Sequence, residues 1–539
     1  MTDTPSRNGG ELAMDVLARY GVAELFTLNG AHIWPFYDAC RKTGTPIYDT
    51  RHEQTATFAA EGMAKLTRRA GVAALTAGPG VTNGISAVAT AQATGSPLVV
   101  LGGRAPQHRW GNGSLQEFDH IPVLSPITKM AATATTAEAI PELVERAVVE
   151  AMTSHRGPTF VDVPLDIAFS SATVELPEVS PLGGPDPDPH EIDKAAALLA
   201  GAERPALIVG GDVYWDHAEG PLRDAVETLR IPTFANGLGR GCLPADHELA
   251  FARTRRLLRD ADVVAVAGTP LDFRLSFGNF GDAKVIHIAD TPSSVAGHVE
   301  LAAAPSGDVA AIFRGLAGYQ GDRRDHADWI TRLRDAETAA RAAEADELAS
   351  DAFPIHPARV YGELRSRLDR DAVVVCDGGD FVSYAGKLVD SYQPGCWLDP
   401  GPLGCLGTGL GYSIAARVAR PQSQVVAMLG DGAAGFDLME ADTLVRHGLP
   451  VVMIVGNNGI WGLEKHPMHG LYGWDAACDL QPHTRYDEVV KALGGAGEVV
   501  EKPGDLGAAI DRAFASGVPY LVNVMTDPAV SYPRSSNLA

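Results

Sequence analysis

Residues 424–436, QVVAMLGDGAAGF, place a short apolar run directly before a glycine-rich segment. A segment with helical spacing, FDLMEADTLVRHG (436–448), separates it from the next apolar run, PVVMIVGNN (450–458). A strand, a helix and a second strand in this order indicate two parallel strands of one sheet, with GDGAAG as the turn that leaves the first strand. Asp431 and Asn458 would then lie at the carboxyl ends of neighbouring strands, where open α/β sheets bind their ligands.

Short apolar runs alternate with amphipathic segments along the whole chain. The runs stand at residues 71–78, 96–103, 205–211, 262–268, 372–379, 424–431 and 450–457. This alternation predicts an α/β fold whose mostly parallel sheets have both faces covered. A proline-rich linker at 176–191 and a charged helical segment at 321–350 divide the chain. We therefore expect three doubly wound domains, at residues 1–175, 190–320 and 353–539.

The composition limits the kinds of partner and compartment. The 539 residues carry a formal net charge of -23, whereas a nucleic acid or an anionic membrane surface requires a basic face, so we expect neither as a partner. The six cysteines have no C-x-x-C or metal-ligand spacing, and no apolar stretch approaches about 18 residues. These features favour a cytoplasmic, multidomain protein with small-molecule ligands.

Two interpretations compete for the glycine-rich segment. GDGAAG satisfies G-x-G-x-x-G, but a dinucleotide-binding turn also requires an acidic residue about 20 positions later. The following strand ends instead in Asn457 and Asn458. The carboxylate of Asp431 and the amide oxygen of Asn458 are hard ligands suited to Mg²⁺, and free N–H groups at a helix start can receive a diphosphate. A metal–diphosphate site is thus favoured, and a plain glycine turn is the structural alternative.

The spacing G-D-G, 24 residues, N-N resembles the signature of thiamine diphosphate (ThDP) enzymes. This resemblance implies that Asp431, Asn458 and the main-chain carbonyl of Ile460 hold Mg²⁺, with Gly432 and Ala433 at the diphosphate. It covers nearly the whole chain, and it implies a pyrimidine-binding, a middle and a diphosphate-binding domain in this order.

A second set of motifs lies in the first predicted domain. RHEQ (51–54) resembles the activating-glutamate segment of the acetolactate synthase group, and TAGPGVTNG (76–84) resembles the G-P-G-x-T-N turn of the same group. The resemblance implies that Glu53 hydrogen-bonds the aminopyrimidine ring and that His52 relays a proton or supports Glu53. The further residues implied to bind the cofactor here are Pro79 and Asn83. A glutamate at a helix start otherwise often serves only to complement the helix dipole.

Two segments of the third predicted domain strengthen the resemblance. GPLGCLGTGLGYSIAA (401–416) resembles the segment whose large apolar residue bends ThDP into its V shape, by position Leu406. CDGGDF (376–381) resembles the D-V-G-Q-H turn that contacts the diphosphate, which implies Gly379 and Asp380. Because Asp380 replaces a glutamine and a carboxylate repels a diphosphate, we expect its contact to differ.

Substrate-facing residues follow from the resemblance to acetolactate synthases. In GSLQEFDHIPVLSPITK (113–129), the active-site glutamine and the nearby lysine of that group correspond to Gln116 and Lys129. Arg274 corresponds to the arginine that receives the carboxylate of the second 2-oxo acid, a group that a guanidinium suits well. An arginine held in a surface salt bridge is the alternative for Arg274.

His32 and Trp461 have both a functional and a structural interpretation. His32 stands in the loop that faces the thiazolium in the resembling family, so it is expected to act as an acid or base near neutral pH. A hydrogen-bonded structural histidine is the alternative. Trp461 is expected to line a substrate channel unless it is a core aromatic residue.

The middle of the chain resembles a different branch of the superfamily. LGRGCLPADHELAFARTRRLLRDADVVAVAG (238–268) resembles 2-hydroxyacyl-CoA lyases and oxalyl-CoA decarboxylases, and it lacks the insertion with which acetolactate synthases contact FAD. FAD is therefore a doubtful cofactor, and the adenine-nucleotide moiety of CoA is its rival.

We predict a ThDP- and Mg²⁺-dependent, acetolactate-synthase-like enzyme. It would decarboxylate a 2-oxo acid such as pyruvate and transfer the hydroxyalkyl unit to a second carbonyl compound. The alternatives are a 2-hydroxyacyl-CoA lyase or oxalyl-CoA decarboxylase acting on acyl-CoA substrates, and a noncatalytic homologue. Since the resembling family holds the two ends of ThDP with different subunits, a homodimer or homotetramer is expected.

Overall fold

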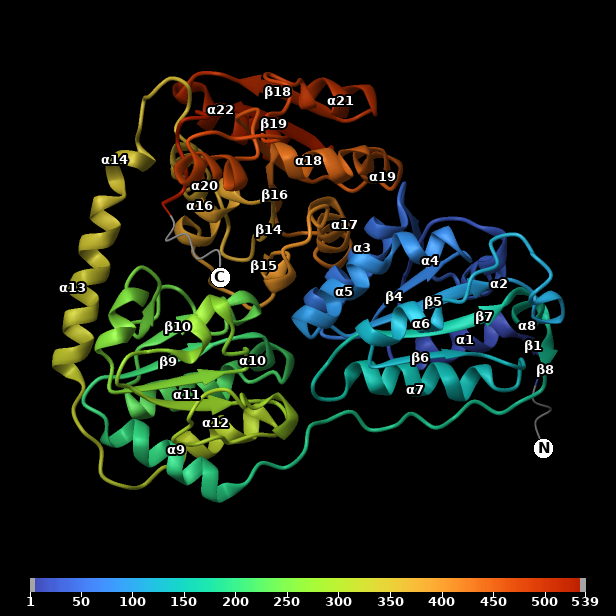
Figure 1. Ribbon diagram of the computed structural model, residues 1–539, viewed down its shortest axis with the longest axis horizontal. Helices are drawn as coiled ribbons and strands as arrows, with labels where there is room; N and C mark the ends of the chain where they lie inside the picture. The colour runs from blue at the N-terminus through green and yellow to red at the C-terminus, as the bar shows by residue number, and fades with distance from the viewer. Residues whose placement is uncertain (1–4, 534–539) are drawn as a thin grey trace.

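Three parallel sheets follow one another along the chain in the computed structural model, which describes residues 5–533 (Figure 1). Each of the seven apolar runs contains one of their strands. The predicted α/β class with three doubly wound parallel sheets is therefore confirmed. The sheets span residues 25–164, 205–288 and 373–525, and the exact domain limits stay a prediction.

The first sheet has the strand order β3-β2-β4-β5-β7-β6, and all its neighbouring strands are parallel. Its strands are β2 (Leu25–Thr27), β3 (Ile47–Asp49), β4 (Gly71–Leu75), β5 (Leu98–Arg104), β6 (Met130–Thr133) and β7 (Thr159–Pro164). Its helices are α1 (Gly9–Arg19), α2 (Trp34–Thr43), α3 (Glu53–Thr67), α4 (Pro79–Asn83), α5 (Ile85–Thr94), α6 (Ile121–Leu124), α7 (Ile140–Met152) and α8 (Leu165–Phe169). A short antiparallel pair, β1 (Arg7–Asn8) with β8 (Ser171–Ala172), joins the two ends of this unit.

The middle sheet has five strands in the order β11-β10-β9-β12-β13. They are β9 (Pro205–Val209), β10 (Thr233–Ala235), β11 (Ala250–Phe251), β12 (Val263–Ala267) and β13 (Lys284–Ile288). Its main helices are α9 (Pro189–Gly201), α10 (Gly211–Trp215), α11 (Glu219–Leu229) and α12 (Val309–Ala317).

The third sheet repeats the strand order of the first, as β15-β14-β16-β17-β19-β18. Its strands are β14 (Val373–Asp377), β15 (Trp397–Leu398), β16 (Val425–Gly430), β17 (Val452–Asn457), β18 (Ala496–Val500) and β19 (Tyr520–Met525). Its helices are α15 (Pro357–Arg365), α16 (Asp380–Leu388), α17 (Gly409–Ala419), α18 (Asp431–Asp437), α19 (Ala441–Arg446), α20 (Gly462–Tyr472), α21 (Tyr486–Ala492) and α22 (Leu506–Ala515). The chain reverses direction across the sheet between β14 and β16, which is the kind of switch point where such sheets bind ligands.

Both faces of each sheet are buried, which explains why the strands read as continuous apolar runs. In β16, Val425, Ala427 and Leu429 enter one core, whereas Val426 and Met428 enter another. Because side chains alternate along a strand, a run that is apolar at every position must supply two cores. Helices on both sides of the sheet provide them (Figure 1).

The first and third units pack on each other through α3 and α17. Gly62 and Gly411 allow this approach: a side chain on Gly411 would meet Phe58, and one on Gly62 would meet Tyr412. At the same contact the buried Glu61 pairs with Lys65 at 2.8 Å, and the hydroxyl of Tyr412 donates to Glu61. Figure 1 shows α3 beside α17 where the two units meet. The amino end of α3 therefore lies against the third unit of the same chain.

Two connections lead into and out of the middle sheet. Residues 173–188 form no helix or strand, and Figure 1 shows them as an extended strip that leads to α9. The outgoing connection contains α13 (Ala327–Ala343) and α14 (Ala345–Leu348), which flank the middle and third units. Within residues 5–533, no helix combines the length and the apolar character needed to cross a membrane.

Candidate active site

Asp431 and Asn458 lie at the ends of adjacent parallel strands. Asp431 follows β16, Asn458 follows β17, and the two strands pair directly. The buried carboxylate of Asp431 accepts hydrogen bonds from the backbone N–H groups of Asn458 at 3.1 Å and Gly459 at 2.6 Å. Burial raises the pKa of Asp431 to about 6, although these amides oppose the shift. The side-chain oxygen of Asn458 accepts from the N–H of Ile460 at 3.2 Å, so all three predicted metal residues gather at one turn.

The glycine-rich segment is helical rather than a turn. We expected GDGAAG to form the exit turn of the strand, but α18 begins at Asp431 itself and ends at Asp437. Gly430 precedes the helix as its N-cap and has an extended backbone conformation. The negative charge of the Asp431 carboxylate, in the first turn, interacts favourably with the positive end of the helix dipole. Gly432 and Ala433 thus lie in the first turn of α18, with their N–H groups at its amino end.

Two glycines stand where a neighbouring group lies too close to leave room for a side chain. An ideal Cβ on Gly432 would lie 2.4 Å from the indole of Trp461, so no side chain fits there. Gly378, at the end of β14, has φ +125° and approaches Gly430, since an ideal Cβ on it would lie 3.1 Å from the Gly430 nitrogen. The backbone of Gly378, after β14, and of Gly430 and Gly432, at the start of α18, therefore forms one small cradle at the switch point.

A cavity of about 440 Å³ opens above this cradle. It is lined by predicted residues from the third unit, which are Gly379, Asp380, Leu406, Asp431, Gly432, Ala433, Asn458, Ile460 and Trp461, and by Arg274 from the middle unit. No residue of the first unit is among its described lining residues. The chain by itself therefore brings together the predicted metal and diphosphate residues but leaves out the predicted pyrimidine residues.

Asp380 has a different contact from the one its family position implies. Its carboxylate accepts a hydrogen bond from the N–H of Tyr532 at 3.0 Å, so the C-terminal segment folds back over the start of α16. Leu406 lines the cavity, and its carbonyl accepts from Gln54 at 3.1 Å. Gln54 is the residue after Glu53, which places the amino end of α3 behind the Leu406 segment.

The predicted pyrimidine-binding residues form a second group at the first sheet. Glu53 begins α3 and is buried, and its Oε2 accepts from the side-chain amide of Asn83 at 2.9 Å. Pro79 is the first residue of α4, the short helix that ends at Asn83. This arrangement fixes the Glu53 carboxyl beside the GPG turn and orients it through the amide of Asn83.

His32 lies next to this group with an environment suited to a neutral ring. Its Nδ1 is 3.1 Å from the hydroxyl of Thr76, directly before the GPG turn. Burial lowers the pKa of His32, and the nearby His120 lowers it further. At physiological pH His32 therefore favours the uncharged form.

His120 is a residue that the sequence analysis missed. Its Nε2 accepts from the N–H of Gly78 at 3.0 Å, and its Nδ1 lies 3.3 Å from Asp162. The GPG turn is thereby tied to a buried imidazole–carboxylate pair. His120 lies within the quoted segment GSLQEFDHIPVLSPITK, four positions after the predicted active-site glutamine, and only that proximity could have drawn attention to it.

Three predicted residues lie outside these groups or make other contacts. His52 is exposed and caps α3, because its Nδ1 accepts from the N–H of Gln54 at 3.1 Å. Gln116 adopts φ +58°, and its backbone packs against Gly78, so it lies near the GPG turn. Lys129 donates to the carbonyl of Thr153 at 2.9 Å and lines neither cavity described in this section. Of these three residues, Gln116 is the one that lies beside the GPG turn.

Arg274 is held in an ion pair and also lines a cavity. It forms a bidentate ion pair with Asp272, with Nη2 2.6 Å from Oδ2. It also lines the cavity above Asp431 and a neighbouring, larger cavity. Its guanidinium therefore stands at the passage between the two spaces, held in orientation by Asp272.

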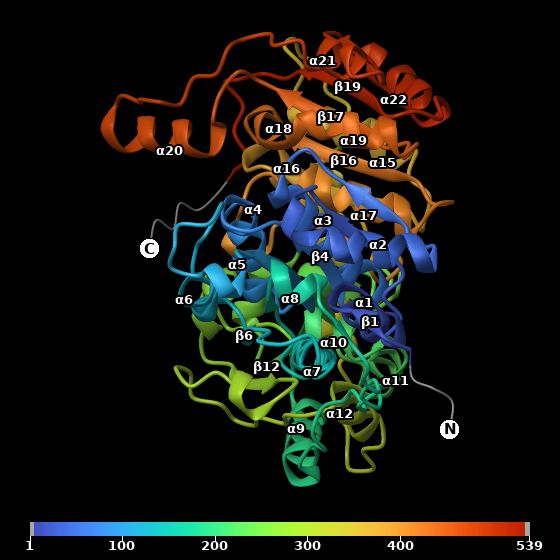
Figure 2. The same cartoon turned by 90° about the vertical axis from the view of Figure 1, so that its right-hand side faces the viewer.

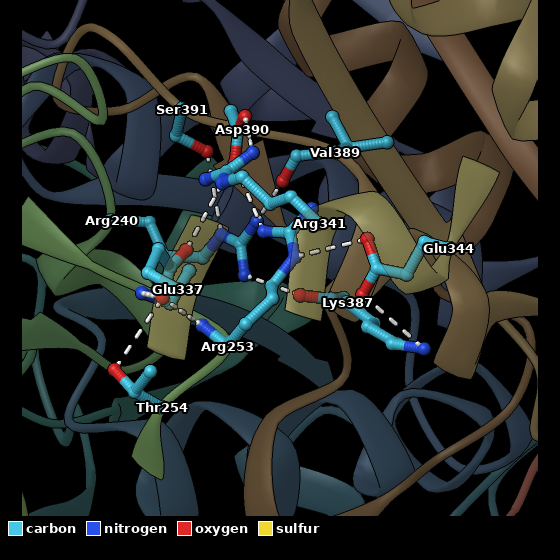
Figure 3. Close-up of polar contacts among 12 residues, drawn as sticks. Arg240, Arg253, Thr254, Glu337, Arg341, Glu344, Lys387, Val389, Asp390 and Ser391 are labelled. Atoms are coloured by element: carbon cyan, nitrogen blue, oxygen red, sulfur yellow. Dashed lines mark hydrogen bonds and ion pairs between the residues drawn. The ribbon is translucent and has the colours of Figure 1, made fainter. Parts of the chain in front are cut away.

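The larger cavity, of about 760 Å³, is rich in cations. It is lined by Arg240, Arg253, Arg255, Arg274, Arg341 and Lys387, and we call it the basic cavity. Figure 3 shows Arg253 between Glu344 and Asp390, at 3.4 Å and 3.1 Å. The buried Nη2 of Arg253 has no hydrogen-bond partner within residues 5–533. Burial lowers the pKa of Arg255 to about 10, and the charges of the nearby Arg240 and Arg274 lower it further.

Two buried carboxyl groups lie beneath the Leu406 segment. Asp377 accepts from the N–H groups of Gly407 and Gly409, both at 2.9 Å, and Asp437 accepts from the N–H of Leu410 at 2.7 Å. The Oδ1 atoms of both aspartates lack hydrogen-bond partners in the described part of the chain. Burial raises the pKa of Asp377 to about 6; burial and the charge of Asp377 raise the pKa of Asp437 well above its usual value.

This acid pair predicts a pH-dependent stability. Because the folded-state pKa values lie above the unfolded ones, protonation stabilises the folded chain at low pH, and this stabilisation is lost as the pH rises through about 6. Asp437→Asn removes one charge and keeps the shape. We expect the unfolding free energy of this variant, relative to wild type, to increase by about 1–3 kcal/mol between pH 5 and pH 8. Denaturant melts across this range provide the measurement.

The exposed Asp335 of α13 supplies the control for that experiment. Asp335→Asn is the same chemical change at a solvated position, so its melts should follow those of wild type at every pH. If Asp437→Asn also follows wild type from pH 5 to pH 8, the two carboxyl groups do not share the proposed coupling.

Three family models match separate parts of the chain. Their descriptions are thiamine pyrophosphate enzyme, N-terminal TPP binding domain, over residues 7–123; central domain, over residues 192–316; and C-terminal TPP binding domain, over residues 377–524. Each match contains strands of one of the three sheets. The cradle above Asp431 lies within the C-terminal match, and Glu53 and Asn83 lie within the N-terminal one.

Similar proteins fall into two groups. A probable acetolactate synthase of Mycobacterium bovis and an acetolactate synthase large subunit of Mycobacterium tuberculosis are each 53% identical to this chain over 552 aligned residues, covering 100% of both chains. 2-Hydroxyacyl-CoA lyase 2 of Bos taurus is 35% identical, over 93% of this chain and 86% of its own. Both groups match along all three sheets, and the identity is higher to the first.

Proposed function

Because this chain belongs to the thiamine pyrophosphate enzyme family, we propose that it is an acetolactate synthase that uses ThDP and Mg²⁺. It decarboxylates pyruvate and transfers the two-carbon unit to a second 2-oxo acid. The observation that carries this proposal is 53% identity to acetolactate synthases over the whole chain, together with a cradle that fits a metal-bound diphosphate. We also propose that the protein is located in the cytoplasm.

The residues at the end of β16 and β17 fit the metal and the diphosphate. The Asp431 carboxylate, the Asn458 amide oxygen and the Ile460 carbonyl are oxygen donors of the kind that Mg²⁺ prefers. The cradle has no room for side chains at Gly432, and the first turn of α18 presents its N–H groups there. A phosphate group at such a helix end is favoured by both hydrogen bonds and the helix dipole. ThDP, when bound, supplies a carbon nucleophile and an electron sink for C–C bond chemistry.

The residues of the first unit fit the other end of the cofactor. With ThDP bound, the Glu53 carboxyl group would hydrogen-bond the aminopyrimidine and move a proton to and from it, and Asn83 holds this carboxyl group in place at 2.9 Å. His32, uncharged beside Thr76, can accept a proton at one ring nitrogen or donate one from the other. Gln116 lies at the same turn and can orient the substrate.

We propose that two copies of the chain complete each site. The cavity above Asp431 has no described lining residue from the first unit, so Glu53 of a second copy must supply the missing contact. Large apolar side chains near this region are exposed in the single chain, among them Leu403, Phe436 and Met439. Exposed apolar surface of this kind is typical of an interface. A homodimer, or a homotetramer built from such dimers, follows.

Product analysis tests the assignment of the substrate. The purified chain is incubated with pyruvate, ThDP and Mg²⁺, with and without added FAD, and acetolactate is measured by chromatography. We expect steady production of acetolactate that requires ThDP and Mg²⁺ and does not require FAD. No acetolactate from pyruvate under these conditions would remove this substrate assignment, while a strict FAD requirement would correct the cofactor set alone.

A second candidate function is supported by the basic cavity. Arg240 and Arg255, which donate to carbonyl and hydroxyl oxygens within the described residues, line a space of about 760 Å³ that adjoins the cavity above Asp431, and their charge suits the phosphate groups of a nucleotide. A 2-hydroxyacyl-CoA lyase would place the nucleotide end of its CoA substrate there. FAD carries a diphosphate of the same chemistry, so the cavity alone does not choose between them.

The same preparation distinguishes the two functions. Incubation with a 2-hydroxyacyl-CoA, ThDP and Mg²⁺ yields formyl-CoA and an aldehyde if the chain is a lyase, and oxalyl-CoA yields formyl-CoA and CO₂ if it is a decarboxylase. We expect neither product at a rate comparable with acetolactate formation. A lyase rate above the synthase rate would replace the leading proposal with the second.

A further inference from the structure

Three titratable side chains form a cluster apart from both halves of the proposed cofactor site. His155 follows α7 of the first unit, Asp212 lies in the first turn of α10, and Asp290 stands two residues after the end of β13. The cluster therefore joins the first unit to the middle one. Nδ1 of His155 is 3.0 Å from Oδ2 of Asp290 and 3.5 Å from Oδ1 of Asp212.

These separations are the ones expected for ligands of a single ion. Zn²⁺ binds histidine nitrogen and carboxylate oxygen at about 2.0–2.2 Å, so two ligands at a tetrahedral angle lie about 3.4 Å apart. One ligand atom from each of the three residues lies within 4.8 Å of the other two.

The cluster contains two buried carboxyl groups and one carboxylate oxygen without a hydrogen-bond partner in the described part of the chain. Asp290 is fully buried, and its Oδ1 has no hydrogen-bond partner within residues 5–533. Arg156, the next residue after His155, pairs instead with Asp216 at 2.8 Å. Two buried carboxylates thus favour positive charge between them.

The cluster is also accessible to an ion. The side chain of His155 is 39% exposed, although Asp212 and Asp290 are buried. His155 and Asp212 line a cavity of about 70 Å³ that extends toward Arg274. An ion can therefore enter from solvent without unfolding either unit.

We propose that His155, Asp212 and Asp290 form a binding site for a divalent transition-metal ion such as Zn²⁺, separate from the Mg²⁺ of the cofactor. One imidazole nitrogen and two carboxylates suit Zn²⁺ better than Mg²⁺, which prefers oxygen ligands and keeps several waters. Because the ligands come from two units, the ion holds the first unit against the middle one. This site does not depend on the proposed reaction.

Ion counting on the full-length protein tests the site. The purified chain, stripped with a chelator and reloaded with ThDP and excess Mg²⁺, is dialysed against increasing Zn²⁺, and bound zinc is measured by mass spectrometry. We expect one Zn²⁺ per chain whose affinity falls at least about tenfold in both His155→Ala and Asp290→Asn. The matched control is His190→Ala, which removes an exposed histidine in the first turn of α9 and should bind zinc as wild type does.

The visible spectrum of bound Co²⁺ shows whether the three side chains coordinate a metal ion or only hydrogen-bond one another. With Co²⁺ in place of Zn²⁺, we expect visible d–d bands without the intense charge-transfer bands of cysteine ligands, and these bands should be absent in Asp290→Asn. Asp290→Asn conserves the shape of the side chain, so its melting curve shows whether the variant is folded. Equal zinc affinity in wild type and both variants, absence of bound zinc in wild type, or a cysteine spectrum would each overturn the proposal.

Discussion

Glu53→Gln lowers kcat by about 10²- to 10⁴-fold while the affinity for ThDP and Mg²⁺ stays within about threefold of wild type; this is the first expected result. Glutamine conserves the shape and can still hydrogen-bond Asn83, but it cannot carry the proton that the carboxyl group exchanges with the cofactor. The Asp431 cradle, which belongs to the third unit, is unchanged by the substitution. Turnover with pyruvate and a fluorescence titration with ThDP measure the two quantities separately.

Glu142→Gln is the control for this substitution. Glu142 is also a glutamate in the first turn of a helix, α7, but it is exposed and makes no contact with either half of the proposed site. Its variant should keep wild-type turnover. Undiminished activity in Glu53→Gln would refute the role of Glu53, whereas an equal loss of ThDP affinity would show that the residue only holds the fold.

The second large effect is expected at Asp431. Asp431→Asn conserves the shape but removes the charge that faces the cation, so the affinity for Mg²⁺ and ThDP should fall by about 100-fold. The turn itself should persist, since an asparagine oxygen can still accept from the N–H groups of Asn458 and Gly459. Titration of ThDP at several Mg²⁺ concentrations measures the loss, and excess Mg²⁺ should restore part of the activity.

Asp328→Asn, an exposed position in the first turn of α13, controls for the change of residue type. We expect wild-type affinity there. If Asp431→Asn also keeps wild-type affinity for both ligands, the metal is held elsewhere, and the cradle argument fails.

Mixing the two inactive variants tests whether each site is shared between chains. In a mixed dimer, one site contains both substitutions and the other contains neither. Co-refolded or co-expressed Glu53→Gln and Asp431→Asn chains should therefore recover about a quarter of wild-type activity if the chains pair at random. Recovery close to zero would indicate that Glu53 and Asp431 act in the same chain.

The fold was largely predictable because local pattern and tertiary environment agree. Strands such as β14 and β16 are apolar at consecutive positions, which only a sheet covered on both faces can bury. The alternation of such runs with amphipathic segments was enough to predict three parallel sheets. It did not reveal that the first and third sheets share one strand order, since strand order depends on long-range pairing that a local pattern does not encode.

The site residues were predictable only where a motif specifies both the position and the chemistry. Asp431 and Asn458 follow paired strands, so their proximity is a consequence of the sheet. Lys129 and His52 belong to equally suggestive segments, but their side chains bind Thr153 and the start of α3. A side chain's direction depends on its surroundings, and sequence spacing cannot supply that information.

The sequence by itself determined the three sheets and the chemical types at the strand ends, because both follow from hydrophobic period and local backbone preference. Only the tertiary structure decided which of these groups meet. It separated Glu53 from the cavity above Asp431, placed Arg274 between two cavities and joined His155 to Asp212 and Asp290. These contacts depend on how whole units pack against one another. The packed surfaces come from elements that lie hundreds of residues apart in the sequence, such as α3 and α17.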